Sequence, residues 1–359
     1  MFSNKEVISS FEGDGYGFTQ HLTFYINNHD LTLSQGLTED IDGILSDAYD
    51  KSMPEALKVV QNALFMIYQI NLCYPLSIPA SLQHDEVISV IRRKIEAKWL
   101  SAEFAGHTSN CWQDDNFAEF LVNVWQGHAA SHHPLFEYLE KDATAEQLYL
   151  FLKSDSALNL IFFDLVSHTL IGAMPETRGT ISENIWDEIG HGDNYFTHVN
   201  LYKNVLERQG IQLPENHYID LYGADALTGH NAFLLGCVNR SHYYKLLGVM
   251  AMTELLDPPQ YSKLIKGCSR LGLTDRDFHY YSEHITIDVK HGEDWLYKVI
   301  KVITDQHPDS KKEFYLGSIL RLQTAERYYD NLLSQIKKIS PIITSGRKAI
   351  LDNEWHIYY

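Results

Sequence analysis

The chain has 359 residues, of which 45% are hydrophobic, and a formal net charge of -18. A chain of this length can bury a sizeable core in one large domain or two ordinary ones. The acidic balance disfavours a general nucleic-acid binder, which needs clustered Lys and Arg. The N-terminus lacks a basic region followed by an apolar run, and no later segment has about 18 uninterrupted apolar residues. We therefore expect a cytoplasmic protein with neither a nucleic-acid nor a membrane partner.

The four cysteines are too widely spaced to form a Cys-x-x-Cys pair; they are Cys73, Cys111, Cys237 and Cys268. This spacing argues against a zinc ribbon and against the disulfide framework of a small secreted domain. A reducing compartment fits the pattern best.

Helical spacing of apolar residues begins early in the chain. Residues 37–73 predict two helices joined near Pro54. Pro75 and Pro79 then interrupt the pattern, because two prolines four residues apart cannot continue a helix. A further helix is predicted over residues 85–104.

The pattern lapses near residues 106–110 and then resumes as a succession of helices, with little of the alternation that is typical of strands. We therefore expect an all-α bundle with ligands projecting inward from several helices. The predicted organisation is an N-terminal helical region packing on the core (1–110), a main domain (111–340) and a C-terminal tail (341–359).

Within the main domain, Thr144 and Gln147 form a predicted capping box, and the helical pattern after it runs on to Asp164 and His168. Long apolar helices are predicted from about residue 226 to 256. A separate helix is expected to start at Asp257-Pro258-Pro259 and to end near Gly272.

Three polar residues share one face of a later helix. His284, Asp288 and His291 stand at i, i+4 and i+7, within roughly 60° of one another around a helix. Two imidazoles and one carboxylate suit Fe(II), with open positions left for oxygen chemistry. The alternative is an amphipathic helix whose polar face carries histidines by chance, since the chain has 18 His.

A metal site also needs ligands from another element. The candidates are Glu188 with His198 or His191, and Asp164 with His168. Glu188 and His191 would lie about 4.5 Å apart along a helix, whereas Glu188 and His198 would be about 15 Å apart on a straight one. Gly190 and Gly192 can break the helix and let the chain fold back. Spacing alone leaves the choice between the two histidines open.

These residues carry a family resemblance. Trp186-Asp187-Glu188 is followed by two glycines and by a His ten positions after the Glu, and His-x3-Asp-x2-His follows about ninety residues later. This order resembles the haem-oxygenase-like diiron oxidases, which are often labelled iron-containing redox enzymes. The likeness extends over roughly residues 130–300.

The resemblance implies a haem-oxygenase-like helical bundle with an N-terminal helical extension and two Fe(II) ions, the second one labile. The family's first-helix ligand is usually Glu with a His four residues later, and here Asp164 and His168 have that spacing. Because Asp is one methylene shorter, the departure leaves open whether one iron or two are held. The implied ligands are Asp164, Glu188, His198, His284, Asp288 and His291.

Three other residues have less direct roles in this interpretation. One branch of the family uses a Glu-x2-His pair, which keeps His191 as an alternative ligand, but the resemblance favours His198. His168 is expected to orient Asp164 or to be an ordinary core histidine. Glu254 is expected to support the site rather than to bind metal.

The resemblance also implies chemistry with O2 as co-substrate on a small amine, amino acid or carboxylic acid. N-oxygenation of an amine or amino acid in specialised metabolism is the favoured reaction, and oxidative C–C cleavage or decarboxylation of an amino or fatty acid is the alternative. An external electron donor and a homodimer are both compatible with this expectation. A different class of function, a metal-free helical protein that binds a ligand or partner, also remains open.

Two further expectations concern substrate binding and the ligand helix. Cationic side chains could capture a substrate carboxylate, with surface solvation as the alternative for each. The β-branched run Ile285-Thr286-Ile287 and Val289 has low helix propensity, so we expect residues 284–292 to be unwound, bent or poorly ordered without metal. The candidate cations are Arg178, Arg240, Lys245 and Arg270.

Overall fold

The computed structural model describes residues 15–107, 112, 115–214 and 217–339. Within these residues every regular element is helical, so the predicted all-α class is confirmed. No helix in the described part of the chain is long and apolar enough to cross a membrane. The predicted tail, 341–359, and the predicted boundary near residue 110 lie outside the described residues.

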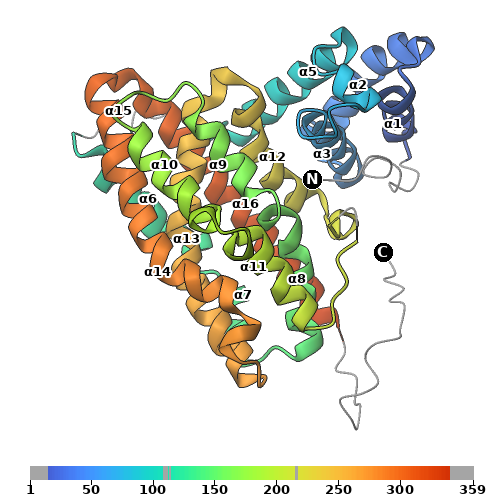
Figure 1. Cartoon of the computed structure of the whole chain (residues 1–359). Coiled ribbons are helices and arrows are strands. Elements are labelled where there is room, and N and C mark those ends of the chain that lie inside the picture. Colours follow the sequence, from blue (N-terminus) through green and yellow to red (C-terminus); the bar gives the residue numbers. More distant parts are fainter. Residues whose placement is uncertain (1–14, 108–111, 113–114, 215–216, 340–359) are drawn as a thin grey trace.

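The N-terminal region forms a separate group of helices beside the main bundle (Figure 1). Two of these helices meet at Pro54, as the sequence predicts, because proline is favoured at the first position of a helix. The helices are α1 (Phe18–Asn28), α2 (Ser34–Tyr49), α3 (Pro54–Gln69), α4 (Ile78–Ser81) and α5 (Glu86–Glu103).

This region attaches to the bundle through α12 (Ala224–Val238). The buried Asn231 of α12 donates hydrogen bonds of 2.9 Å to the backbone carbonyl and the side-chain oxygen of Gln61 on α3. Just beyond α12, Asn239 donates to Glu96 Oε2 at 2.9 Å. Paired polar groups of this kind fix the register between two packed helices.

The main bundle is built around two long partners that run in the same direction, α13 (Tyr243–Arg270) and α16 (Lys311–Lys338). They cross closely, because a Cβ on Gly248 would lie 2.4 Å from the Phe314 carbonyl oxygen. The other helices are α6 (Phe117–Gly127), α7 (Pro134–Lys141), α8 (Ala145–Asn159), α9 (Phe162–Leu170), α10 (Arg178–Glu188), α11 (His198–Arg208), α14 (His279–Asp294) and α15 (Lys301–Gln306), with a π-helical segment at Trp295–Ile300.

Helix α13 does not stop where the sequence pattern predicts. It continues through Pro258 and Pro259 to Arg270, so the expected separate helix is wrong. Each proline lacks the N–H that would bond four residues back, which removes the helical donors for the carbonyls of Glu254 and Leu255. Burial of this helix against α7, α14 and α16 holds it together across the two prolines.

Helix α14 is uninterrupted from His279 to Asp294, contrary to the expectation of an unwound segment at 284–292. Packing outweighs the low propensity of its β-branched residues. Tyr280 and Tyr281 are buried, and Gly292 lets the helix approach α13, because a Cβ there would lie 3.0 Å from Leu255 Cδ2. The π-helical segment follows directly.

Candidate metal centre

A tight loop separates α10 from α11, and both helices run in the same direction along α14. Glu188 is the last residue of α10, and Gly190, His191 and Gly192 have positive φ values of 59°, 54° and 86°. A Cβ on Gly190 would lie 2.4 Å from the carbonyl carbon of Phe196, so only glycine allows this close return. The predicted break at the glycines is confirmed, and the next helix begins at His198.

The loop brings His198 beside Glu188 and so completes a first group of three buried ligand residues. Glu188, His198 and His284 each place one donor atom within 4.8 Å of the others. His198 Nδ1 lies 3.0 Å from Glu188 Oε2, and the two imidazole centroids are 4.4 Å apart. His284 Nδ1 donates to the carbonyl of Tyr280 at 2.7 Å, which leaves its Nε2 unprotonated. That nitrogen is therefore available to a metal.

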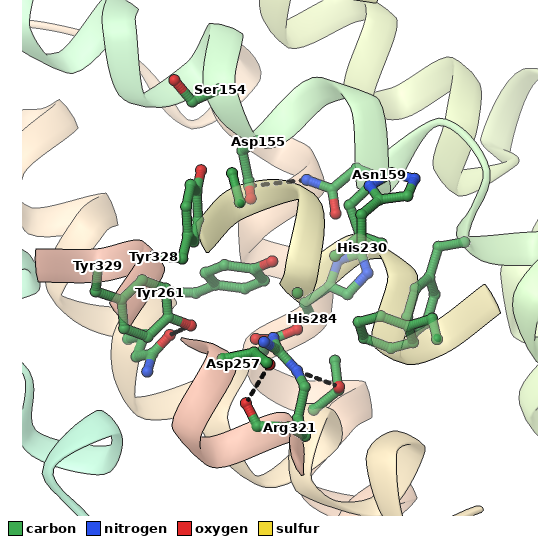
Figure 2. Close-up of a pocket in the computed structure, with 18 of the residues that line it drawn as sticks. Ser154, Asp155, Asn159, His230, Asp257, Tyr261, His284, Arg321, Tyr328 and Tyr329 are labelled. Atoms are coloured by element: carbon green, nitrogen blue, oxygen red, sulfur yellow. Dashed lines mark hydrogen bonds between the residues drawn. The ribbon is translucent and has the colours of Figure 1, made fainter. Parts of the chain in front are cut away.

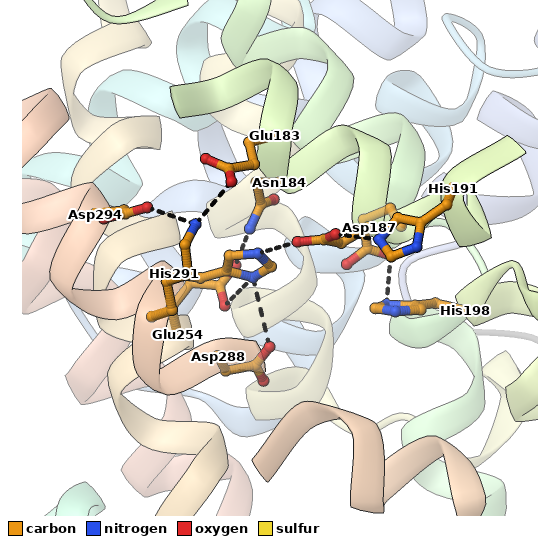
Figure 3. Close-up of polar contacts among 11 residues, drawn as sticks. Glu183, Asn184, Asp187, His191, His198, Glu254, Asp288, His291 and Asp294 are labelled. Atoms are coloured by element: carbon orange, nitrogen blue, oxygen red, sulfur yellow. Dashed lines mark hydrogen bonds and ion pairs between the residues drawn. The ribbon is translucent and has the colours of Figure 1, made fainter. Parts of the chain in front are cut away.

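A second buried group lies beside the first along α14. It consists of Glu254 from α13 with Asp288 and His291 from α14 (Figure 3). His291 Nδ1 is 3.6 Å from Glu254 Oε2 and 3.7 Å from Asp288 Oδ1. Asn184 of α10 donates to the other oxygen of Glu254 at 3.2 Å. Three helices thus orient one imidazole and two carboxylates.

Asp187 fixes the His291 ring from the opposite side. His291 Nε2 donates to Asp187 Oδ2 at 2.8 Å, so Nδ1 faces the two carboxylates. The second oxygen of Asp187 accepts from His191 Nε2 at 2.7 Å. A carboxylate behind a ligating imidazole is the usual way in which proteins set its tautomer and raise its basicity. Sequence reasoning assigned Asp187 no such role.

Negative charge is crowded in the second group. Burial, and then the charge of Glu254, raise the pKa of Asp288 well above its usual range. Burial alone would lower the pKa of His291, but hydrogen bonds to Asp288, Glu254 and Asp187 raise it to about 11. The side chains of Asp288 and His291 therefore both retain protons that a divalent cation would displace on binding.

The pKa values in the first group are shifted by different causes. Burial and the neighbouring His198 lower the pKa of His284 well below its usual range, so this imidazole is neutral. Burial would also lower the pKa of His198, but the charge and hydrogen bond of Glu188 raise it. Two imidazoles with one carboxylate suit non-haem Fe(II), and the more acidic second group suits a hard divalent cation such as Fe(II) as well. The donor sets thus fit two iron ions.

Asp164 joins neither group. Its side chain is exposed on α9, whereas Phe162 of the same helix lines the cavity described below. Residues two apart on a helix point about 200° away from each other, so both cannot face the cavity. His168 lies one turn after Asp164 and also stays outside the groups. Asp164, which the resemblance implies as the first-helix ligand, therefore lies away from both groups. Glu254, which was expected only to support the site, is a member of the second group.

His191 and His198 differ clearly in where their side chains lie. The His191 side chain is 65% exposed, stacks on Trp186 and donates a hydrogen bond to Asp187. His198 is 4% exposed and faces Glu188 and His284. The tight loop at the glycines produces this difference, because it turns His191 outward and brings the start of α11 inward.

A cavity of about 60 Å³ adjoins both groups (Figure 2). Glu188, Glu254, His284 and Asp288 form part of its wall. One of the cations around it, Arg321 of α16, had no role in the sequence analysis. The four candidate cations lie elsewhere and bond to carbonyls or a carboxylate outside the cavity: Arg178, Arg240, Lys245 and Arg270.

Two comparisons bear on this site. Residues 150–326 match the family model described as "Iron-containing redox enzyme". The chain is also 28% identical over 130 residues to a nitrosourea synthase from Streptomyces achromogenes subsp. streptozoticus. That match covers 34% of this chain and only 26% of the relative, so the chain spans about a quarter of the length of this relative.

Proposed function

Since residues 150–326 belong to the iron-containing redox enzyme family, we propose that the chain is a non-haem diiron enzyme that uses O2 to oxidise a small amine or amino acid at nitrogen, in specialised metabolism. Iron-dependent redox chemistry follows from the family. The number of irons, the use of O2 and the reaction at nitrogen are the proposal.

The observation that carries the diiron proposal is the pair of buried three-residue groups beside one cavity. Glu188, His198 and His284 would hold one ion, and a second group would hold the other. In that second group Glu254 takes the place expected of Asp164, which supports two irons despite the missing first-helix ligand. Three protein ligands per ion leave coordination positions open.

The relative's name favours oxidation at nitrogen. A nitrosourea contains nitrogen bonded to oxygen, so a protein named for its synthesis is associated with that chemistry. Insertion of one oxygen atom of O2 into an N–H bond of a primary amine gives a hydroxylamine and one water, and consumes two electrons and two protons. When bound, iron supplies the site at which O2 is activated and the first two electrons. An external donor would then restore the ferrous state.

The chain's own residues would prepare this chemistry. Asp187 holds the His291 ring in place, and the Tyr280 carbonyl holds the His284 ring, so the ligand nitrogens point inward before metal binds. Buried aromatic side chains around the cavity exclude bulk water from the reacting atoms. The acidic walls of the cavity disfavour the carboxylate of a fatty acid.

The test is O2 uptake by the full chain, reconstituted anaerobically with Fe(II). Primary amines and amino acids should accelerate uptake and give hydroxylamine products that carry one atom of 18O from 18O2. The His198→Ala variant should lose this response, whereas His279→Ala, at an exposed position on α14, should keep it. Acceleration by fatty acids alone would favour oxidative C–C cleavage instead. A chain that neither binds iron nor consumes O2 would favour a metal-free binding protein.

A further inference from the structure

The cavity has acidic walls that the two metal groups do not account for. Asp155 of α8 and Asp257 of α13 both line it (Figure 2). Asp155 accepts a 2.8 Å hydrogen bond from Asn159 and a longer one from Tyr281, and Asp257 is hydrogen-bonded by Tyr261. Neither carboxylate has an ion-pair partner among the residues that the structure describes. Unpaired carboxyl groups in such surroundings are costly to folding.

Arg321 lies close to both carboxylates without pairing with them. Its Nε donates to Thr253 at 2.9 Å, and its guanidinium lies over the Phe233 ring at 5.3 Å. Its positive charge lowers the pKa of Asp155 and that of Asp257. One guanidinium beside two carboxyl groups leaves at least one of the two without a cationic partner among the described residues.

Other features of the wall also suit a cation. His230 is only 3% exposed, lines the cavity, and its Nε2 has no hydrogen-bond partner within the described chain. Burial lowers the pKa of this imidazole to about 3, so it stays neutral and can accept a hydrogen bond. Aromatic rings of Tyr261, Tyr328 and Tyr329 surround the same space. Such rings attract cations through their faces.

We propose that this cavity binds a positively charged nitrogen of the substrate, an ammonium or guanidinium group, between Asp155 and Asp257. This inference rests on the proposed function and narrows its substrate to a basic amine, such as a diamine or a basic amino acid. The cavity volume of about 60 Å³ suits the amine end of such a molecule rather than a bulky body. In this assignment His230 accepts a hydrogen bond from the bound N–H.

The position of Asp257 places the bound cation beside the metal groups. Asp257 follows Glu254 by three residues on α13, which is about 4.5 Å along the helix. Glu188, His284 and Asp288 line the same cavity. A molecule anchored at Asp257 would therefore reach the ions that these residues hold.

The protonation of Asp257 is consistent with this assignment. Burial raises its pKa to about 8, against the opposing charge of Arg321 and with a further rise from Asp155 and Glu254. The carboxyl thus holds a proton in the ligand-free protein near neutral pH. An organic cation can take the place of that proton, as a metal cation does in the neighbouring group.

The test is a binding measurement by calorimetry on the Fe(II)-loaded full chain, kept free of O2. The probes are n-butylamine, which is cationic at neutral pH, 1-butanol, which is neutral, and butyrate, which is anionic. Butylammonium should bind at least about tenfold more tightly than the other two, because a desolvated charge pair contributes at least that factor. Equal or tighter binding of butanol or butyrate would overturn the proposal.

Variants give a second test, because substitutions of the carboxylates and of the arginine should change the affinity in opposite directions. Asp155→Asn and Asp257→Asn should each weaken butylammonium binding by about tenfold or more, while Arg321→Gln should tighten it. Asp305→Asn, at an exposed carboxylate on α15, is the matched control and should leave binding unchanged. Wild-type affinity in both cavity Asn variants would contradict the assignment, and if a variant fails to fold, the three probes on the wild-type chain still decide. Because no O2 is present, a failure of the proposed oxidation leaves this result intact, and the reverse also holds.

Discussion

Nε2 of the buried His291 lies 2.8 Å from Oδ2 of Asp187, on the opposite side of the ring from the two carboxylates of the second group. Asp187 directly precedes Glu188 of the first group, so one turn of α10 serves both candidate iron sites. The contact leaves Nδ1 of His291 free to face the second group. The end of α10 therefore provides a ligand of the first group and also orients a ligand of the second.

Removal of this contact should weaken iron binding at the second group. We expect Asp187→Ala to lower Fe(II) affinity there by about 10- to 100-fold, the usual effect of losing a carboxylate behind a ligating imidazole. Asp187→Asn should recover part of the loss, because its amide oxygen can still accept from Nε2. Competition with a chelator under anaerobic conditions measures the affinity. Equal affinity in wild type and Asp187→Ala would show that His291 needs no such support.

The two carboxylates that compete for the role of additional ligand can be separated directly. Glu254→Ala should reduce affinity for one of two irons by at least about tenfold, because it removes one of three donors from the second group. Asp164→Ala should bind both irons as wild type does, since Asp164 is exposed on α9. The measurement is iron content after gel filtration. The reverse pattern would restore the assignment based on the sequence alone.

Gly190 is expected to control the first group through the backbone. Gly190→Ala places a Cβ against the Phe196 backbone at a φ of 59°, so it should cost about 1–3 kcal/mol in the free energy of unfolding and displace His198. Chemical unfolding and iron affinity measure the two effects. The matched control is Gly179→Ala in α10, where a Cβ would meet nothing within 4 Å and helix propensity improves. If both variants behave alike, the tight loop is not what positions His198.

The buried His230 should make the stability of the folded protein sensitive to acid. Its pKa falls from 6.5 in the unfolded chain to about 3 in the folded protein, because of burial and the charge of His217. Above pH 6.5 neither state binds the proton, so His230 has no effect there on the pH dependence of stability. As pH falls from 6.5 towards 3 the unfolded state gains a proton that the folded state excludes, and stability is lost.

The His230→Gln variant isolates this effect from that of other histidines. Between about pH 7.5 and about pH 4.5, wild type should lose on the order of 2 kcal/mol more of its free energy of unfolding than the variant does. Urea unfolding of the metal-free chain at the two pH values gives the comparison. An identical loss in both proteins would mean that His230 accepts a proton in the folded state.

Much of this arrangement follows from local sequence patterns. The spacing of His284, Asp288 and His291 places them on one face of a helix, and the two glycines after Glu188 indicate the break that lets His198 return beside Glu188. Both are properties of short segments, which helix periodicity and glycine's freedom at positive φ determine. The all-α class follows in the same way from apolar periodicity along the chain.

Tertiary packing decides what the patterns leave open. The sequence cannot indicate that α9 turns Phe162 rather than Asp164 towards the cavity, because both residues lie on one short apolar helix. The continuation of α13 through Pro258 and Pro259 is also a tertiary effect, since local rules place a helix start there. Glu254 faces the second group only because that helix continues and packs against α14.

The most direct test of the two-iron centre is an anaerobic titration of the metal-free full chain with Fe(II), followed by Mössbauer spectroscopy. Wild type should bind two ferrous ions per chain, and His198→Ala and His291→Ala should each bind one with wild-type affinity and the other weakly or not at all. A wild-type chain that binds no more than one ion, or variants that still bind two with undiminished affinity, would contradict the assignment of the two groups as iron sites.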